Sequence, residues 1–222
     1  DISLTGQFSS LQGSHDAPWI GVALAGSGDY LISNSHIEAT DYALKASGTG
    51  TLSVADSLFL SENNGFSFSG ISHTTLDNVT LNISQGGEKG IDILQGAHTF
   101  SGLEVNMPFN QYATGSTGIE AWWCSIDSQN ITVTGFANSM SVHESDLVAE
   151  DLHLLDSSKQ GLYASSSMIH VSDSFETKYS DAGLTMVSSN AVLRTWSSSY
   201  HEDGAIVDSE SEVTVWDLTS IS

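Results

Sequence analysis

The chain has 222 residues, of which 27 are Asp or Glu and only 5 are Lys or Arg, so its formal net charge is -22. This balance argues against nucleic acid and anionic membrane surfaces as partners, because both are bound by Lys and Arg. No hydrophobic run approaches the ~18 residues needed to span a bilayer, so we expect no membrane insertion, and the single cysteine, Cys124, excludes an intrachain disulfide.

Short apolar alternations recur along the chain at similar intervals. The first full unit begins at Gly21-Val22-Ala23-Leu24 and continues with short strands at Tyr30–Ile32 and around Ile37. Later units repeat this pattern, in which a start residue, usually Gly, is followed by an apolar residue, any residue and a second apolar residue. Their expected starts are Asp41, Gly65, Gly90, Gly118, Ser139, Gly161, Gly183 and Gly204, and the longest interval carries an insertion at residues 106–117.

Such a unit is too short to bury its own apolar side, so units must stack on one another as in a solenoid. Helical repeats are disfavoured because no amphipathic stretch of about 10 residues is visible, and the leucine-rich frame is absent. A sandwich of antiparallel strands remains open. The even spacing favours stacked coils. Because the chain begins at Asp1 without Met and stops within a repeat, we expect one domain over residues 1–222, cut from a longer protein.

Polar pairs lie between the second and third strands of several units. Asp, Asn and Ser tolerate bends and bond to neighbouring backbone, so a column of them predicts the same corner in successive coils. The expected corners are Asn34-Ser35, Asp56-Ser57, Asp77-Asn78, Glu150-Asp151 and Asp173-Ser174.

Three motifs together resemble a known repeat. They are Gly-apolar-x-apolar starts such as Gly90-Ile91-Asp92-Ile93, the Asn63-Asn64-Gly65 run, and the apolar-x-apolar-x-Asp-Ser pattern over residues 52–57. The combination resembles the right-handed parallel β-helix repeat of the pectin-lyase-like superfamily. The resemblance implies an all-β, right-handed parallel β-helix of about nine coils. Because that superfamily includes pectate lyases, hydrolases, epimerases, phage tailspikes and adhesins, the fold does not choose a function.

Aligning the starts predicts which residues become neighbours, since equivalent residues in stacked coils lie about 4.8 Å apart. The first apolar column is Tyr42, Phe66, Ile91, Ile119, Met140, Leu162, Leu184 and Ala205, and the second begins with Leu44, Phe68, Ile93 and Ala121. The outward column between them places Asp92 beside Glu120. Trp122, His143 and Tyr163 are expected close by, and Tyr112 and Asn110 of the insertion are expected to fold over the same face.

Two chemical interpretations of this face stay open. In the first, Asp92 and Glu120 are a catalytic acid and base with His143 as a further acid or base; one carboxyl pKa should then rise, and a separation near 5 Å suits a retaining glycosidase. In the second, this aromatic and acidic face only binds a ligand, through Trp122, Tyr163, Tyr112 and Asn110. A lyase is disfavoured because the few Lys and Arg residues are spread over distant units and the charge repels polyuronates.

No cofactor is expected, and the His residues show no metal-ligand spacing. The carboxylates offer two candidate sites for calcium, one at Asp181 with Glu202-Asp203 and one at Asp208 with Glu210 and Glu212. Three glycosylation sequons begin at Asn78, Asn82 and Asn130.

The charge and the sequons favour an extracellular or cell-surface protein, in a marine or halophilic setting, because a carboxylate coat resists aggregation at high salt. We therefore expect a non-enzymatic segment that acts as an adhesin, stalk or glycan-binding module, with carbohydrate, another surface protein and neighbouring domains of the same chain as partners. The alternative is a polysaccharide hydrolase, lyase or epimerase that uses Asp92 and Glu120.

Overall fold

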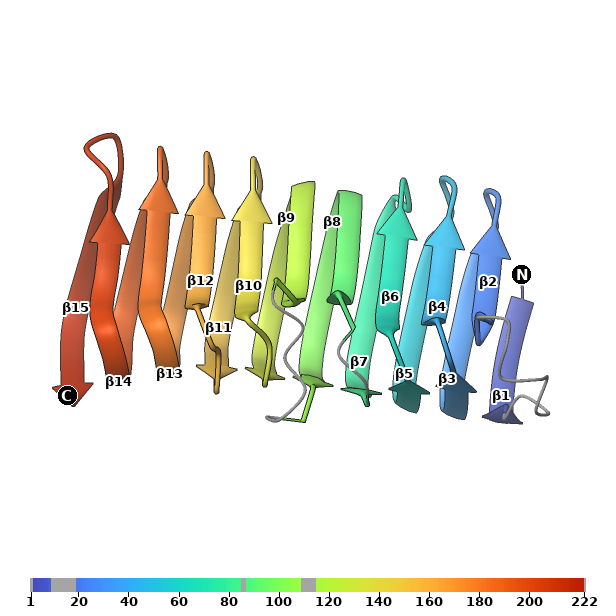
Figure 1. The fold of residues 1–222 in the computed structure, drawn as a ribbon. Coiled ribbons are helices and arrows are strands. Elements are labelled where there is room, and N and C mark those ends of the chain that lie inside the picture. The colour runs from blue at the N-terminus through green and yellow to red at the C-terminus, as the bar shows by residue number, and fades with distance from the viewer. Residues whose placement is uncertain (1, 9–18, 85–86, 109–114, 222) are drawn as a thin grey trace.

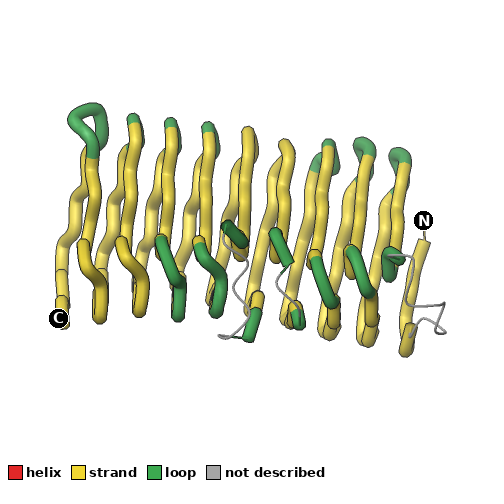
Figure 2. Tube along the Cα trace, in the orientation of Figure 1, coloured by secondary structure: helices red, strands yellow, loops and turns green. Residues whose placement is uncertain are grey.

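The described residues form a parallel β-solenoid of about nine turns. The computed structural model describes residues 2–8, 19–84, 87–108 and 115–221, and these contain strands but no helix. In Figure 1 the strands nearer the viewer run upward, those behind run downward, and the chain advances from right to left. This is a right-handed winding, the hand that parallel crossovers favour. Short turns and loops lie at the corners between the strands (Figure 2).

Two sheets lie back to back, and every strand pair among the described residues is parallel. The front sheet consists of β2 (Val22–Ala25), β4 (Tyr42–Ser47), β6 (Asn64–Ser69), β10 (Asn138–His143), β12 (Gln160–Ser165), the first parts of β8 (Lys89–Asn106) and β9 (Thr117–Thr134), and the last parts of β13 (Met168–Val187) and β14 (Asn190–Val207). The back sheet consists of β1 (Ile2–Phe8), β3 (Asp29–Ala39), β5 (Thr51–Ser61), β7 (His73–Ile83), β11 (Asp146–Leu155), β15 (Glu212–Ile221) and the remaining parts of β8, β9, β13 and β14.

The apolar columns predicted from the sequence fill the space between the two sheets. Ile91 pairs with Ile119, and Ile93 pairs with Ala121, and all four side chains are fully buried. The register continues from Ile119 to Met140 and onward through β12, β13 and β14. The predicted side-by-side arrangement of successive units is therefore confirmed from Phe66 to Val207.

The predicted alignment is wrong by two residues in one unit. Leu44, not Tyr42, pairs with Phe66, and Tyr42 pairs with Asn64. The reason is that each unit starts with a small residue, whereas the predicted start of this unit, Asp41, is a larger polar residue. A Cβ on Gly65 would lie 2.1 Å from the carbonyl oxygen of Gly90. Ala43, which is fully buried, fills the equivalent position, so this unit starts there and not at Asp41.

The predicted polar corners lie in one column along the solenoid, but their backbone conformation differs between the two halves of the chain. Asn34, Asp56 and Asn78 have positive φ values of 48°, 48° and 53°, a region that Asn and Asp tolerate well. At the other two expected corners the register shifts instead, between residues 149 and 151 and between residues 171 and 174. Those corners are formed by an irregular pairing and not by left-handed residues.

A buried ladder of serines holds the corner where the front sheet turns into the back sheet. The backbone N–H groups of Cys124, Ser145, Ser167 and Ser189 each donate to the hydroxyl of the next serine in the ladder, at 3.0 to 3.2 Å. Because the corner breaks the strand ladder, these hydroxyls replace carbonyl acceptors that would otherwise be missing. The ladder fixes the ends of β10 and β12 and the bend of β9.

Candidate functional site

The predicted acidic pair is present on the front sheet, and a lysine bridges it. Asp92 of β8 pairs in register with Glu120 of β9. The ammonium group of Lys89 lies 3.1 Å from Asp92 Oδ1 and 2.7 Å from Glu120 Oε2. All three side chains are partly buried, with 31% of Asp92, 18% of Glu120 and 34% of Lys89 exposed. The cation therefore compensates two carboxylates that would otherwise repel one another.

Asp92, Glu120 and Lys89 form a charged triad. Its protonation differs from that expected for a catalytic acid and base, in which one carboxyl pKa is raised. Burial alone would raise the pKa of Glu120, but the hydrogen bond and charge of Lys89, with the hydrogen bond from Trp122, lower it. Burial likewise opposes the charge on Lys89, while its bonds to Glu120 and Asp92 raise its pKa above the ordinary value. The expected rise is thus not found at Glu120, which is ionised at neutral pH and unsuited to donate a proton.

An aromatic row continues from the acidic pair toward the C-terminus. The indole Nε1 of Trp122 donates a hydrogen bond to Glu120 Oε1 at 3.2 Å. The Trp122 ring stacks on the imidazole of His143, with centroids 3.8 Å apart and an interplanar angle of 6°. Tyr163 follows, its ring centroid 5.4 Å from that of His143. Trp122, His143 and Tyr163, called here the aromatic row, come from three successive coils: β9, β10 and β12.

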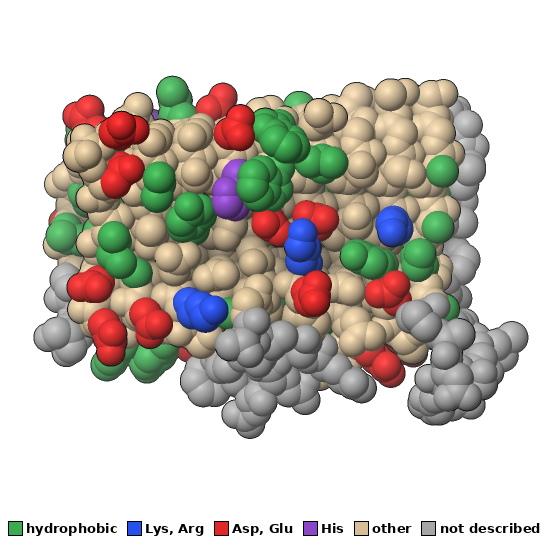
Figure 3. All heavy atoms as spheres, turned by 45° about the horizontal axis from the view of Figure 1, so that its top comes forward, with side chains coloured by type: hydrophobic (Ala, Val, Ile, Leu, Met, Phe, Trp, Pro, Cys, Tyr) green, Lys and Arg blue, Asp and Glu red, His purple; other side chains and the backbone are tan. Residues whose placement is uncertain are grey.

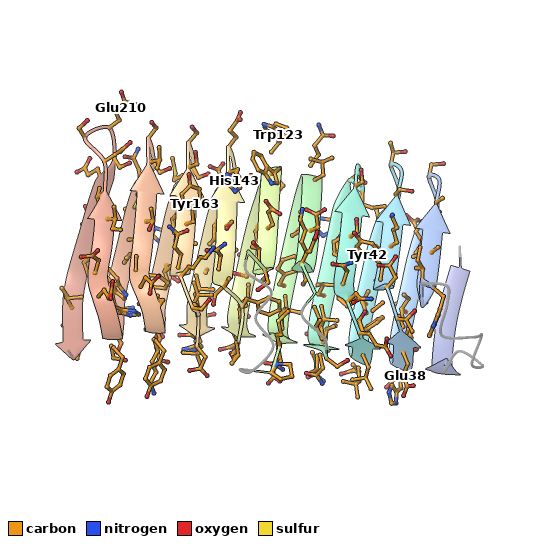
Figure 4. The ribbon with its side chains drawn as sticks, viewed as in Figure 1. Glu38, Tyr42, Trp123, His143, Tyr163 and Glu210 are labelled. Atoms are coloured by element: carbon orange, nitrogen blue, oxygen red, sulfur yellow. The ribbon has the colours of Figure 1, made fainter. Side chains whose placement is uncertain are left out.

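His143 is neutral at neutral pH, because burial lowers the pKa of its imidazole below the ordinary value despite the negative charges of Glu120 and Glu144. In Figure 4, His143 and Tyr163 lie beside one another on neighbouring coils, and Trp123 stands at the upper edge. Trp123 is 49% exposed and its ring lies 5.6 Å from that of Trp122. The row therefore offers partly exposed ring surface with an uncharged centre.

The space-filling view shows the same face from above. A histidine lies against hydrophobic side chains near the middle of the face, next to a basic side chain flanked by acidic ones (Figure 3). Four hollows of about 420 to 600 Å³ lie on the described part of the solenoid, and neither Asp92 nor Glu120 lines any of them. The 600 Å³ hollow is lined by Trp123, which is a neighbour of the aromatic row and not a member of it, and by Cys124 and Ser145 of the corner.

Tyr112 and Asn110 lie outside the described residues. Of the sequon asparagines, Asn78 and Asn130 are exposed at corners with φ of 53°. Asn82 is half-buried in β7, where its side-chain oxygen accepts a hydrogen bond from Asn106 at 3.1 Å.

Lys89 is the site residue that the sequence interpretation missed. It was grouped with lysines on distant units, although it stands three residues before Asp92 and pairs in register with Thr117. Its backbone N–H also donates to Asn64 Oδ1 at 3.4 Å, which ties it to the preceding coil. The column of residues just before each small start, which includes Asn64 and Lys89, was the available signal.

No group of three or more His, Cys, Asp or Glu side chains in the described residues is arranged to hold a metal ion. At the second of the two expected calcium positions, Asp208 accepts hydrogen bonds from the Ser211 hydroxyl and from the backbone N–H groups of Ser188 and Glu210. These bonds lower the pKa of its carboxyl group. No long apolar helix that could cross a membrane occurs in the part of the chain that the structure describes.

Comparison with known proteins returned no match, whether to family models, curated proteins or solved structures.

Proposed function

We propose that this solenoid is a non-enzymatic, glycan-binding module whose binding surface is the aromatic row. The observation that carries the proposal is the stack of Trp122 on His143 next to a carboxylate pair already paired with Lys89. An aromatic face suits the apolar side of a sugar ring, and fixed polar groups at its edge suit the hydroxyls. These features support a role in recognition.

The rival function, a glycoside hydrolase that uses Asp92 and Glu120, retains one favourable observation, which is the in-register pairing of the two carboxylates. A hydrolase of this type needs one carboxyl group that holds its proton at the working pH. Lys89 works against this at Glu120, whose pKa is lowered. The charges of the triad thus favour a structural ion pair over an acid–base pair.

The wider setting belongs to the same proposal. We infer an extracellular or cell-surface location, supported by the acidic composition and by the exposure of Asn78 and Asn130 at two sequons. We also propose kinship with the pectin-lyase-like superfamily, on the repeat motifs and the right-handed coil. Further domains of a longer chain or another surface protein are the expected neighbours.

A glycan-array screen tests the proposal, with the wild type beside Trp122→Ala, His143→Ala and the control Trp216→Ala. Trp216 is matched to Trp122 in residue type and is 78% exposed on the distant strand β15. Binding that is lost in Trp122→Ala and His143→Ala and retained in Trp216→Ala supports the proposal. No hits, or hits that all four proteins share, would overturn it.

A further inference from the structure

Two stacked tyrosines form a second aromatic surface, separate from the aromatic row. Tyr179 of β13 and Tyr200 of β14 occupy the same position in neighbouring coils, at the corner where the back sheet turns into the front sheet, because the residues on either side of them pair in register. Their ring centroids lie 4.7 Å apart with an interplanar angle of 11°. The residues are 44% and 53% exposed, so this stack lies in solvent and contributes little to the core.

The backbone at this corner does not favour tyrosine. Tyr179 and Tyr200 have φ values of 53° and 59°, a region that is costly for bulky side chains. The preceding coils place Asp156, with φ of 53°, and Gly135, with φ of 85°, at the same corner, and Gly and Asp tolerate this conformation better. Burial does not repay the cost of the tyrosines, which points to a role for their exposed rings.

A hollow of about 420 Å³ adjoins the two rings. Both tyrosines line it together with the carboxylate residues Asp181 and Glu202, and with Ser157, Ser158, Ser180 and His201. Asp181 and Glu202 are exposed. Neither belongs to any ion pair between described residues. No ion pair therefore compensates their negative charge, and they line the same hollow as the two tyrosines.

One ring of the stack already contacts a cation. The Lys178 ammonium group lies 5.2 Å from the centroid of the Tyr179 ring, within the range of cation–π attraction. Among the described residues, Tyr200 has no such cation and is the more exposed ring of the two.

We propose that Tyr200, Asp181 and Glu202 form a binding site for an organic cation of the alkylammonium or guanidinium type. The tyrosine face attracts the delocalised charge, while the two carboxylates supply its counter-charge. A free small cation and a basic side chain of a partner share this chemistry. The site is independent of the glycan-binding proposal, since it shares no residue with the aromatic row.

Protein labelled with ¹³C-tyrosine is titrated with tetramethylammonium chloride, with sodium chloride at equal ionic strength as the control. The chain has six tyrosines, and Tyr179→Phe and Tyr200→Phe assign the two relevant signals. We expect the Tyr200 ring signals to shift to saturation with tetramethylammonium and to move little with sodium. Equal shifts with both salts would identify nonspecific counterion binding and overturn the site.

Variants separate the ring from the charges. Tyr200→Leu removes the ring, and its binding is measured from the Tyr179 signals. This variant and the double variant Asp181→Asn/Glu202→Gln should each weaken the binding of tetramethylammonium about fivefold or more. Tyr163→Leu, on the aromatic row, should leave this binding unchanged. Unchanged affinity in either site variant overturns the proposal. Where circular dichroism shows that Tyr200→Leu has not folded, the carboxylate variant alone decides.

A tetralysine peptide distinguishes the two sources of the cation. Tighter binding of the peptide than of tetramethylammonium supports a basic partner segment as the source. Affinity no greater than that of tetramethylammonium supports a free small cation.

Discussion

The rings of Trp122 and His143 lie 3.8 Å apart and within 6° of parallel, although the residues belong to different coils. The Trp122 N–H bonds to Glu120 and thereby to the ion pair with Lys89. The aromatic row is thus oriented by the charged triad beside it. A substitution in the charged triad should therefore be detectable in the aromatic row, and a substitution in the row should be detectable in the triad.

Protonation of His143 should occur below the ordinary histidine pKa of about 6.5. Burial lowers the pKa, so His143 contributes stability above that value, and the contribution is lost as the pH falls below it. Imidazolium against the indole should quench Trp122 fluorescence. We therefore expect a fluorescence step with its midpoint below pH 6.5, absent in His143→Gln. A midpoint above 6.5 would show that cation–π attraction outweighs burial.

Removing the bridging cation should leave the two carboxylates uncompensated. For Lys89→Met we expect a loss of about 1 kcal/mol in the free energy of unfolding at pH 8, because the pair is partly exposed. The ion pair stabilises the fold above the carboxylate pKa and not below it, so the loss should shrink at pH 3. Urea denaturation at both pH values measures this.

Lys45→Met is the matched control for that experiment, since Lys45 lies 4.9 Å from the ring of Tyr42 and in no ion pair between described residues. An equal loss for Lys89→Met at both pH values would mean that packing, and not charge, stabilises the triad.

The small-residue column should be sensitive to one added methyl group. Gly65→Ala places a Cβ 2.1 Å from the Gly90 carbonyl and 2.3 Å from Leu81, so we expect a loss of about 3 kcal/mol or more. Gly204 starts the last unit, where an added Cβ meets nothing within 4 Å. Gly204→Ala should therefore change the stability by less than about 0.5 kcal/mol. Thermal denaturation of both proteins decides, and similar losses would contradict the account.

Buried His98 should make the fold sensitive to mild acid. Burial lowers its pKa to about 4, its Nε2 faces the Gln95 carbonyl at 3.1 Å, and its Nδ1 has no partner. Stability is complete above pH 6.5 and falls as the pH drops toward 4, by about 3 kcal/mol. Guanidinium denaturation should show a flatter pH profile for His98→Asn over this window. Parallel profiles would refute a role for His98.

The sequence predicted the coil and its core well because both depend on patterns along the chain. Alternating apolar residues and small starts such as Gly90 and Gly118 report which Cα atoms become neighbours. These patterns gave the wrong partner for Tyr42, because the small residue that starts this unit is Ala43 and not a glycine. At residues 150–151 the polar pair correctly predicted a corner, but not that a register irregularity forms it in place of a left-handed residue.

The chemistry of the site was harder to predict, because it depends on how far side chains reach. Asp92 and Glu120 were correctly placed as neighbours, yet the long Lys89 side chain that joins them starts outside their column. The Tyr179–Tyr200 stack was accessible in principle from their matching positions before Gly183 and Gly204. That both rings project into solvent follows only from the three-dimensional corner.

The most direct test of the central claim is affinity electrophoresis in gels that contain a polysaccharide identified by the array, combined with an assay for new reducing ends. The account predicts that the wild type and Trp216→Ala are retarded, that Trp122→Ala migrates freely, and that no reducing ends appear. Sugar release that disappears in Asp92→Asn and Glu120→Gln, or equal retardation of Trp122→Ala and the wild type, would contradict it.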